Sequence, residues 1–204
     1  NPSSTGTELK SLLDTIQPIE NGWNVFKSGA LAIASRWPIT NRAGNITPTG
    51  AKPVMAALVD LPDADFPVDL YLMNVHYRCC GGTTNDPLRQ RDSDAIVSWM
   101  RDARTPGGSV ELPYATPMIV LGDMNIVGGQ QPLLTLATGD IQDNARYGVD
   151  SFPDWDGSAN TILDATHNAV AGADTYTWRN NMSQFDPGRL DYIVYTDSVL
   201  APTK

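Results

Sequence analysis

The chain has 204 residues, of which 41% are hydrophobic and 18% are charged, and its formal net charge is −9. These values are typical of one globular domain that is large enough to bury a core, and they exclude long disordered segments. Tight binding to nucleic acid depends on Lys and Arg residues that neutralise phosphates, so an acidic chain without a basic block is a poor general nucleic-acid binder. A divalent metal ion can supply positive charge locally, so a nuclease is disfavoured and not excluded.

The hydropathy of the chain and the positions of its cysteines argue against two further kinds of protein, one with a membrane-spanning segment and one held together by disulfides. No apolar run approaches the roughly 18 to 20 residues that are needed to cross a bilayer. The two cysteines, Cys79 and Cys80, are adjacent. Neighbouring residues can bridge each other only through a strained ring, so this pair is no disulfide framework, and we interpret both as small side chains near the end of a strand. Cysteine usage therefore does not indicate the cellular compartment of the protein.

The first half of the chain predicts one helix and three strands. Leu9, Leu12, Leu13 and Ile16 recur at helical spacing, which predicts a helix over residues 8–17 that ends at Pro18. The apolar run at 29–36 predicts a buried strand. Residues 54–60 and 69–76 predict two further strands, joined by a turn rich in Pro and Asp, as in a hairpin.

The longest expected helix begins at Asp86, as N-cap, with Pro87 in the first helical position, and it ends before Pro106. One face is apolar, and the charged residues are expected elsewhere on the helix. The apolar residues are Leu88, Ala95, Ile96, Trp99, Met100 and Ala103, and the charged ones are Arg89, Arg91, Asp92, Asp94 and Arg101.

The second half predicts a central strand at 117–121, because this run is the most apolar in the chain and ends at Gly122-Asp123. A short helix is expected over 133–137, then a long polar loop over 138–174, and two last strands at 175–179 and 190–196. Strands outnumber helices and the two types alternate. A layered α/β or α+β sandwich of sheets with outer helices fits this order.

Polar residues stand at the ends of three of these apolar strands. The strand period of two places Asn74, His76 and Arg78 on one side, and it places Asp123 and Asn125 together. Asp191 lies inside an apolar run, where a carboxylate is costly unless it is paired or bound to a cation. Each residue taken alone has a structural interpretation: a turn-forming Asp, an exposed His, a buried hydrogen-bond partner. Their joint occurrence at strand ends, where sites gather, favours a functional site.

Several segments in this order resemble the endonuclease/exonuclease/phosphatase superfamily, which includes DNase I-like nucleases and bacterial sphingomyelinases. They are GALAIASRWPI (29–39), NVH (74–76), an arginine-bearing helix, IVLGDMN (119–125), YTW (176–178) and RLDYI (189–193). The match runs from about residue 29 to 196, and its Asn-x-His and Gly-Asp-x-Asn elements are fairly specific in combination. The resemblance implies a four-layer sandwich of two mixed β-sheets flanked by helices, here incomplete.

The resemblance also implies roles for four residues in phosphoester hydrolysis. Asp123 would orient or deprotonate the attacking water and is a candidate metal ligand. Asn125 would hold a phosphoryl oxygen or Asp123 itself, and His76 would donate to a phosphate oxygen. Asp191 would fix and polarise a second histidine. The expected cofactor is Mg²⁺, or else Mn²⁺ or Ca²⁺.

Three further residues are candidate substrate contacts: Asn74, Arg78 and Trp178. An Arg or a Trp near a strand end packs against other residues more often than it contacts a substrate. His167, in the polar loop, is expected at the surface.

Two elements of the family pattern are not found in this sequence. The metal-binding Glu of a Gln-Glu strand does not precede Gly29, and Glu20 follows no apolar strand. The Asp-His pair that follows the Asp191 motif in the family is also not found before Lys204. We therefore expect residues 1–204 to be a single domain truncated at both ends, which by itself hydrolyses phosphoesters poorly.

Two other functions stay open at this point. A protein of the same fold that has lost catalysis would be a binding module. An unrelated sandwich that binds carbohydrate or protein would require Asp123 and His76 to lie far apart. If the chain is an enzyme, its acidic charge favours a small or lipid-linked phosphoester over nucleic acid, and no obligate protein partner is evident.

Overall fold

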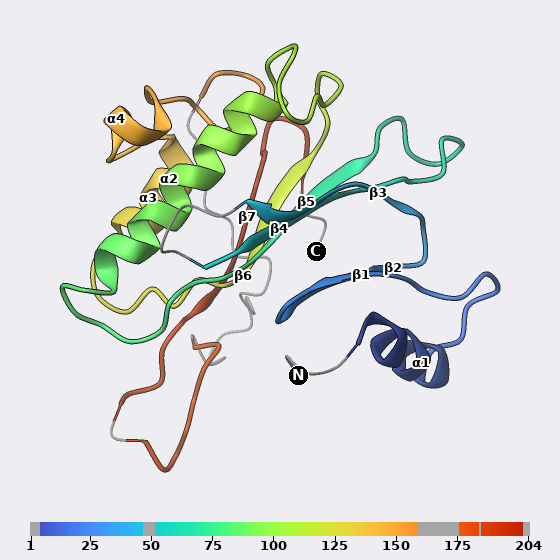
Figure 1. The fold of residues 1–204 in the computed structure, drawn as a ribbon, viewed down its shortest axis with the longest axis horizontal. Helices are drawn as coiled ribbons and strands as arrows, with labels where there is room; N and C mark the ends of the chain where they lie inside the picture. Colours follow the sequence, from blue (N-terminus) through green and yellow to red (C-terminus); the bar gives the residue numbers. More distant parts are fainter. Residues whose placement is uncertain (1–4, 47–51, 159–175, 184, 202–204) are drawn as a thin grey trace.

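The computed structural model of the chain describes residues 5–46, 52–158, 176–183 and 185–201. These residues form two sheets and several helices (Figure 1). In chain order the elements are α1 (Gly6–Ile16), β1 (Asn24–Ser28), β2 (Leu31–Ser35), β3 (Ile39–Ile46), β4 (Val54–Val59), β5 (Leu70–His76), α2 (Asp86–Ala103), β6 (Met118–Asp123), α3 (Gln131–Thr138), α4 (Asn144–Tyr147) and β7 (Asp191–Tyr195).

The elements are arranged in four layers. Helix α1 contacts β1 on the outer side of the two-stranded sheet β1-β2, and β2 in turn contacts β4 and β5 of the five-stranded sheet. Helices α2 and α3 cover the opposite face of that larger sheet (Figure 1). The expected α+β sandwich is thus confirmed. The larger sheet is mixed, and the smaller one is antiparallel.

Two apolar clusters hold the layers together. The larger cluster lies between the five-stranded sheet and α2 and α3, and includes Tyr71, Met73, Val75, Ile96 and Met100. The smaller cluster lies between the two sheets and is formed by Leu31, Ile33, Ile39, Met55 and Ala57. Among the described helices, none is both long and apolar enough to span a membrane.

The order of strands in the larger sheet is β3-β4-β5-β6-β7. Only the pair β5–β6 is parallel, and α2 forms part of the connection between these two strands. In the register of the sheet, His76 is the partner of Asp123, and Asp123 is the partner of Asp191. The ends of β5 and β6 and the start of β7 therefore meet at one edge of the sheet.

The apolar segments of the sequence are found close to their expected bounds. The expected helix 8–17 is α1, whose start is fixed by a capping box between Thr5 and Glu8. The expected strands at 29–36, 54–60, 69–76, 117–121 and 190–196 correspond to β2, β4, β5, β6 and β7, and β4 and β5 pair as the expected hairpin. The expected helix at 133–137 is α3.

Four elements differ from the sequence expectation, and one of them is helix α4, which lies within the loop expected over 138–174. Strands β1 and β3 were not expected: β1 is short, Gly29 (φ 59°) belongs to the turn that joins β1 to β2, and β3 is polar with two irregularities in its pairing with β4. The strand expected at 175–179 is wrong for its described residues, where Trp178 makes one isolated bridge with Gly188. The reason is that the Thr177 hydroxyl, instead of a backbone ladder, accepts hydrogen bonds from the amides of Leu190 and Asp191.

Helix α2 buries charges that the sequence placed away from its apolar face. Arg89, Asp92 and Asp94 are all buried, and the N-cap is Asn85, one residue before Asp86. Hydrogen-bond partners compensate the burial of Arg89 and Asp94, and those of Asp94 lie in the segment around residue 142. Asp94 accepts hydrogen bonds from the backbone amides of Gln142 and Asp143.

The buried carboxyl group of Asp92 has fewer compensating hydrogen bonds than buried Arg89 and Asp94 on the same helix. Burial raises the pKa of this carboxyl to about 8, against the lowering effect of the Lys52 backbone amide and of the positive charge on Arg78. The side chain is therefore mostly protonated at neutral pH.

Gly122 is required by the close approach of β6 to β5. Its φ is 135°, and a Cβ at this position would lie 2.1 Å from the backbone oxygen of Val75. Any side chain would therefore separate the two strands just before Asp123.

We expect Gly122→Ala to lower the free energy of unfolding by more than about 2 kcal/mol, because a methyl group meets backbone in a conformation that favours glycine. Urea denaturation followed by circular dichroism measures this loss. Gly129→Ala is the matched control: a Cβ there meets nothing within 4 Å, and we expect a change within about 0.5 kcal/mol. Equal stabilities of the two variants would contradict the argument.

Candidate active site at the edge of the larger sheet

Strand register brings three of the expected site residues together. His76 ends β5, Asp123 ends β6, and Asp191 begins β7, and the three are neighbours across the sheet. Residues paired in register point to the same face of a sheet. This face is turned toward β1-β2, because Asn74, two residues before His76, donates a hydrogen bond from Nδ2 to the backbone oxygen of Ala32 at 2.9 Å.

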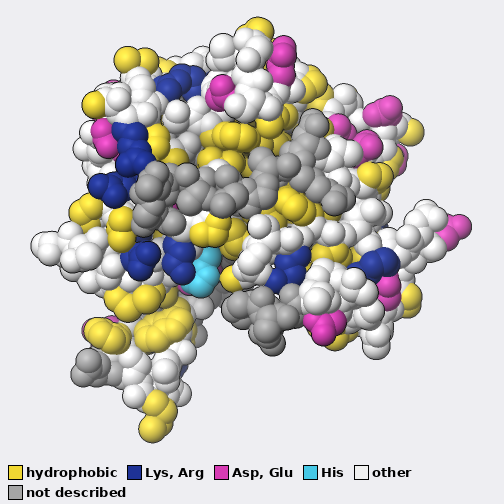
Figure 2. All heavy atoms as spheres, viewed as in Figure 1, with side chains coloured by type: hydrophobic (Ala, Val, Ile, Leu, Met, Phe, Trp, Pro, Cys, Tyr) yellow, Lys and Arg dark blue, Asp and Glu magenta, His cyan; other side chains and the backbone are white. Residues whose placement is uncertain are grey.

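The imidazole of His76 lies close to the carboxylate of Asp123. His76 Nε2 is 3.7 Å from Asp123 Oδ2, and the side chains are 50% and 34% exposed. Figure 2 shows that, on the face it draws, Lys and Arg side chains (dark blue) gather near a histidine (cyan). The short distance excludes the unrelated sandwich, which required these two residues to lie far apart.

Asn125 joins the site by a turn and not by strand periodicity. It follows the end of β6 with φ at 46°, in the left-handed region that Asn tolerates better than most residues. Its backbone amide donates to Asp123 Oδ1 at 2.9 Å, and its buried side chain donates from Nδ2 to the backbone oxygen of Tyr77 at 3.2 Å. The residue thus fixes the Asp123 carboxylate and links the ends of β5 and β6.

The electrostatics of the site centre on Asp123. Partial burial raises the pKa of this carboxyl, and the negative charge of Asp191 raises it further. The hydrogen bond from the Asn125 backbone, the nearby His76 and the Asn125 side chain lower it. The net direction is upward, because partial burial, the largest effect, disfavours the charged carboxylate and repulsion by Asp191 adds to it.

Arg89 is a residue of the site region that sequence reasoning missed. Its side chain is 2% exposed, and it contacts both loops that follow the site strands. Nη1 donates to the backbone oxygens of Arg78 and Cys80, each at 2.8 Å, and Nη2 donates to Val127 O at 3.1 Å and to Asp86. The signal available in the sequence was an arginine at the first turn of a helix directly after the strand that carries His76.

Two of the three expected substrate contacts lie beside the cluster and not within it. Arg78 follows the end of β5, and its positive charge acts on Asp92 of α2. Trp178 lies at the neck of the loop before β7, where it pairs with Gly188. The third, Asn74, uses its amide to hold β2. His167 lies outside the described residues.

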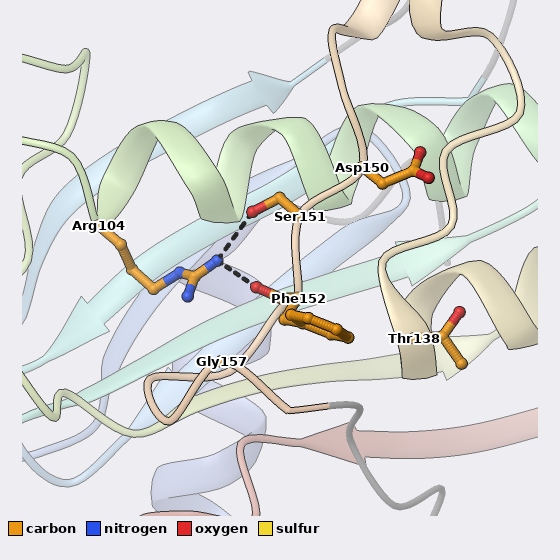
Figure 3. Close-up of a pocket in the computed structure, with 6 residues that line it drawn as sticks. All are labelled: Arg104, Thr138, Asp150, Ser151, Phe152 and Gly157. Carbon is orange, nitrogen blue, oxygen red and sulfur yellow. Dashed lines mark hydrogen bonds between the residues drawn. The ribbon is translucent and has the colours of Figure 1, made fainter.

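A cavity of about 330 Å³ lies elsewhere in the molecule (Figure 3). It is lined by Arg104, just after α2, and by residues of the segment 138–157, and Arg104 donates hydrogen bonds to Ser151 and Phe152 there. None of the four clustered residues lines it. Within the described ranges, no group of three or more His, Cys, Asp or Glu side chains is arranged to hold a metal ion.

The model of the endonuclease/exonuclease/phosphatase family matches residues 9–203, which is nearly the whole chain. The chain belongs to this family. No curated protein sequence matches it.

Solved structures with the same fold include variants of one toxin and the protein SmcL. A beta hairpin deletion mutant of beta toxin from Staphylococcus aureus has a TM-score of 0.61 and 17% identity, over 97% of this chain and 71% of that chain. A second beta toxin variant, with bound magnesium ions, has a TM-score of 0.57 and 17% identity, over 89% of this chain and 57% of that one. SmcL has a TM-score of 0.51 and 15% identity, over 90% and 60%. The chain thus spans between about half and about 70% of the length of these proteins.

We expect Asp191→Asn to lower the pKa of Asp123, because the variant removes a like charge and keeps the shape of the side chain. Carboxyl-carbon NMR titration of the metal-free chain measures this pKa. Asp156→Asn serves as the control, since Asp156 is bonded to Ser158 in a separate exposed turn. A pKa of Asp123 that is the same in both variants would show that the two carboxylates do not interact.

Proposed function

We propose that the protein is a metal-dependent hydrolase of phosphoester bonds, with His76, Asp123, Asn125 and Asp191 as its site residues. The observation that carries the proposal is the meeting of these residues at one sheet edge in a chain of the endonuclease/exonuclease/phosphatase family. The arrangement offers an imidazole and two carboxylates to one small ligand, and hydrolysis of a phosphoester uses such groups for proton transfer and charge stabilisation.

Asp123 is proposed to orient and deprotonate the attacking water. A general base works best when its pKa lies near the operating pH, and the pKa of Asp123 is raised in that direction by burial and by Asp191. The bond from the Asn125 amide holds Oδ1, so Oδ2, which faces His76, is the oxygen left to accept the proton of water.

His76 is proposed to donate a hydrogen bond to a phosphate oxygen, where negative charge develops in the transition state. Its ring is half-exposed, so a substrate can reach it. Asn74, Arg78 and Trp178 remain candidate substrate contacts, and for Asn74 and Arg78 the structural uses described above compete with that role.

A divalent cation fits the donors of this edge. Mg²⁺ is commonly bound by one or two carboxylates, with water and substrate phosphate completing its shell. Asp123 and Asp191 are two carboxylates at paired positions whose repulsion a cation would relieve. When bound, Mg²⁺ (or Mn²⁺ or Ca²⁺) would neutralise charge on the phosphate and on the leaving oxygen. The beta toxin variant of similar fold holds magnesium ions.

The proposed substrate is a small or lipid-linked phosphoester. The chain carries 23 acidic and 14 basic residues, so it provides little of the positive surface that tight binding to a nucleic-acid backbone requires. The alternative, an inactive binding module on the same fold, would bind phosphate without turnover, and the same variants distinguish the two.

The test is turnover of an activated phosphodiester in the presence of Mg²⁺. It is measured on this chain and on a polypeptide extended along its gene at both ends. In the more active of the two, we expect Asp123→Asn to lower kcat by at least about 100-fold, the usual contribution of a general base. We expect His76→Gln to lower it similarly.

The control variant is Asp156→Asn, which removes one charge from an exposed turn and should leave the rate unchanged. Turnover that survives in Asp123→Asn would contradict the assigned roles. Binding of phosphate with Mg²⁺ but no turnover in either polypeptide would favour the binding module.

A further inference from the structure

The adjacent cysteines lie close to the candidate site and have no role in the proposed reaction. Cys79 and Cys80 are both exposed and both free, in the loop that leaves β5 three residues after His76. Their Sγ atoms are 2.9 Å apart. A disulfide bond is about 2.04 Å long, so the two sulfurs need to move by only about 1 Å to bond.

The backbone brings the two thiols to the same side. Neighbouring side chains in an extended strand point to opposite faces, so adjacent sulfurs would normally diverge. Here Cys80 has φ at 70°, a left-handed conformation that is unfavourable for a residue with a Cβ. Arg89 holds this conformation, because Nη1 bonds the carbonyl oxygens on both sides of the pair, those of Arg78 and Cys80.

We propose that Cys79 and Cys80 form a dithiol site that a small-molecule disulfide oxidises to an intramolecular vicinal disulfide. The Cys79 thiolate attacks one sulfur of the small molecule, which forms a mixed disulfide and releases the first small thiolate. Cys80, as thiolate, then attacks the Cys79 sulfur and releases the second. The protein loses two S–H bonds and gains one S–S bond, and the two protons go to the two released thiols.

The contact between the sulfurs also affects the protonation of Cys80. The hydrogen bond to Cys79, and repulsion from it, raise the pKa of the Cys80 thiol, and the positive charge of Arg89 partly offsets this.

The bond is expected to be readily reversed by a thiol reductant. Adjacent Cα atoms are about 3.8 Å apart across a trans peptide, which is shorter than the usual 4.4 to 6.8 Å between bridged cysteines. Strained and exposed disulfides are the labile ones.

A disulfide bond between Cys79 and Cys80 closes a small ring, and the formation of this ring affects the candidate site through Arg89. The same guanidinium that bonds Cys80 O from Nη1 bonds Val127 O from Nη2, and Val127 lies two residues after Asn125. Forming the ring turns the peptide groups around Cys80 and withdraws a carbonyl from Arg89. Arg89, whose Nη2 bonds Val127 O, then loses one of the bonds that hold its guanidinium in place.

The chemistry is tested by treating the chain with oxidised glutathione and measuring intact mass under denaturing conditions. We expect a product lighter than the reduced chain by two hydrogen atoms, without a glutathione adduct, and with both alkylatable thiols lost. Dithiothreitol should restore both thiols. Cys79→Ser and Cys80→Ser, each with one thiol, should stop at the glutathione adduct. A wild-type chain that also accumulates the adduct, or that only forms covalent dimers, would overturn the proposal.

The link to the site is tested on the same oxidised chain by amide hydrogen exchange. We expect the peptide covering residues 124–130 to exchange about tenfold faster, because the guanidinium that bonds Val127 O is itself held less firmly. The control is the double variant Cys79→Ser with Cys80→Ser, treated identically, in which exchange should not change. Ring closure without faster exchange in this peptide would overturn the link.

Discussion

The parallel pairing of β5 with β6 is the constraint on which the candidate site depends. Its register makes His76 and Asp123 direct neighbours, and it is possible only because Gly122 lets the two backbones approach. Antiparallel pairing of β6 with β7 then adds Asp191 on the other side of Asp123. Three strands that are far apart in sequence thus deliver one imidazole and two carboxylates to one edge.

Hydrogen bonds behind this edge hold the strand ends in place. Asn125 links Asp123 to Tyr77, and Arg89 links the loop after β5 to the loop after β6. A buried guanidinium is costly unless its donors are satisfied, and Arg89 satisfies Nη1 and Nη2 with three backbone carbonyls and Asp86. The bond network therefore fixes loop positions that apolar packing alone would leave free.

The site itself carries an electrostatic cost. Asp123 and Asp191 repel each other in a partly buried place, which raises the pKa of Asp123. Such perturbed carboxylates are characteristic of functional sites, since a ligand or cation that binds there relieves the repulsion. The repulsion between the two carboxylates is therefore better explained by a role in binding than by a role in stability.

The buried strands of the larger sheet could be predicted from sequence because both of their faces are covered. Strands β4 and β6 are near-continuous apolar runs, and the ends of β5 and β6 placed His76 and Asp123 at neighbouring positions. Strand β3 could not be recognised, since it is polar and interrupted. The periodicity of the sequence could not predict the burial of Arg89 and Asp94 either. Their burial depends on backbone groups that lie beside them only after the loops have folded.

The most direct test of the account is an NMR titration of the isotopically labelled chain with Mg²⁺ and inorganic phosphate. We predict shift changes concentrated at His76, at residues 122–126 and at Asp191, which largely vanish in Asp123→Asn. Changes confined to the cavity around Arg104, or no saturable change at all, would contradict the claim that this sheet edge binds a phosphate beside a cation.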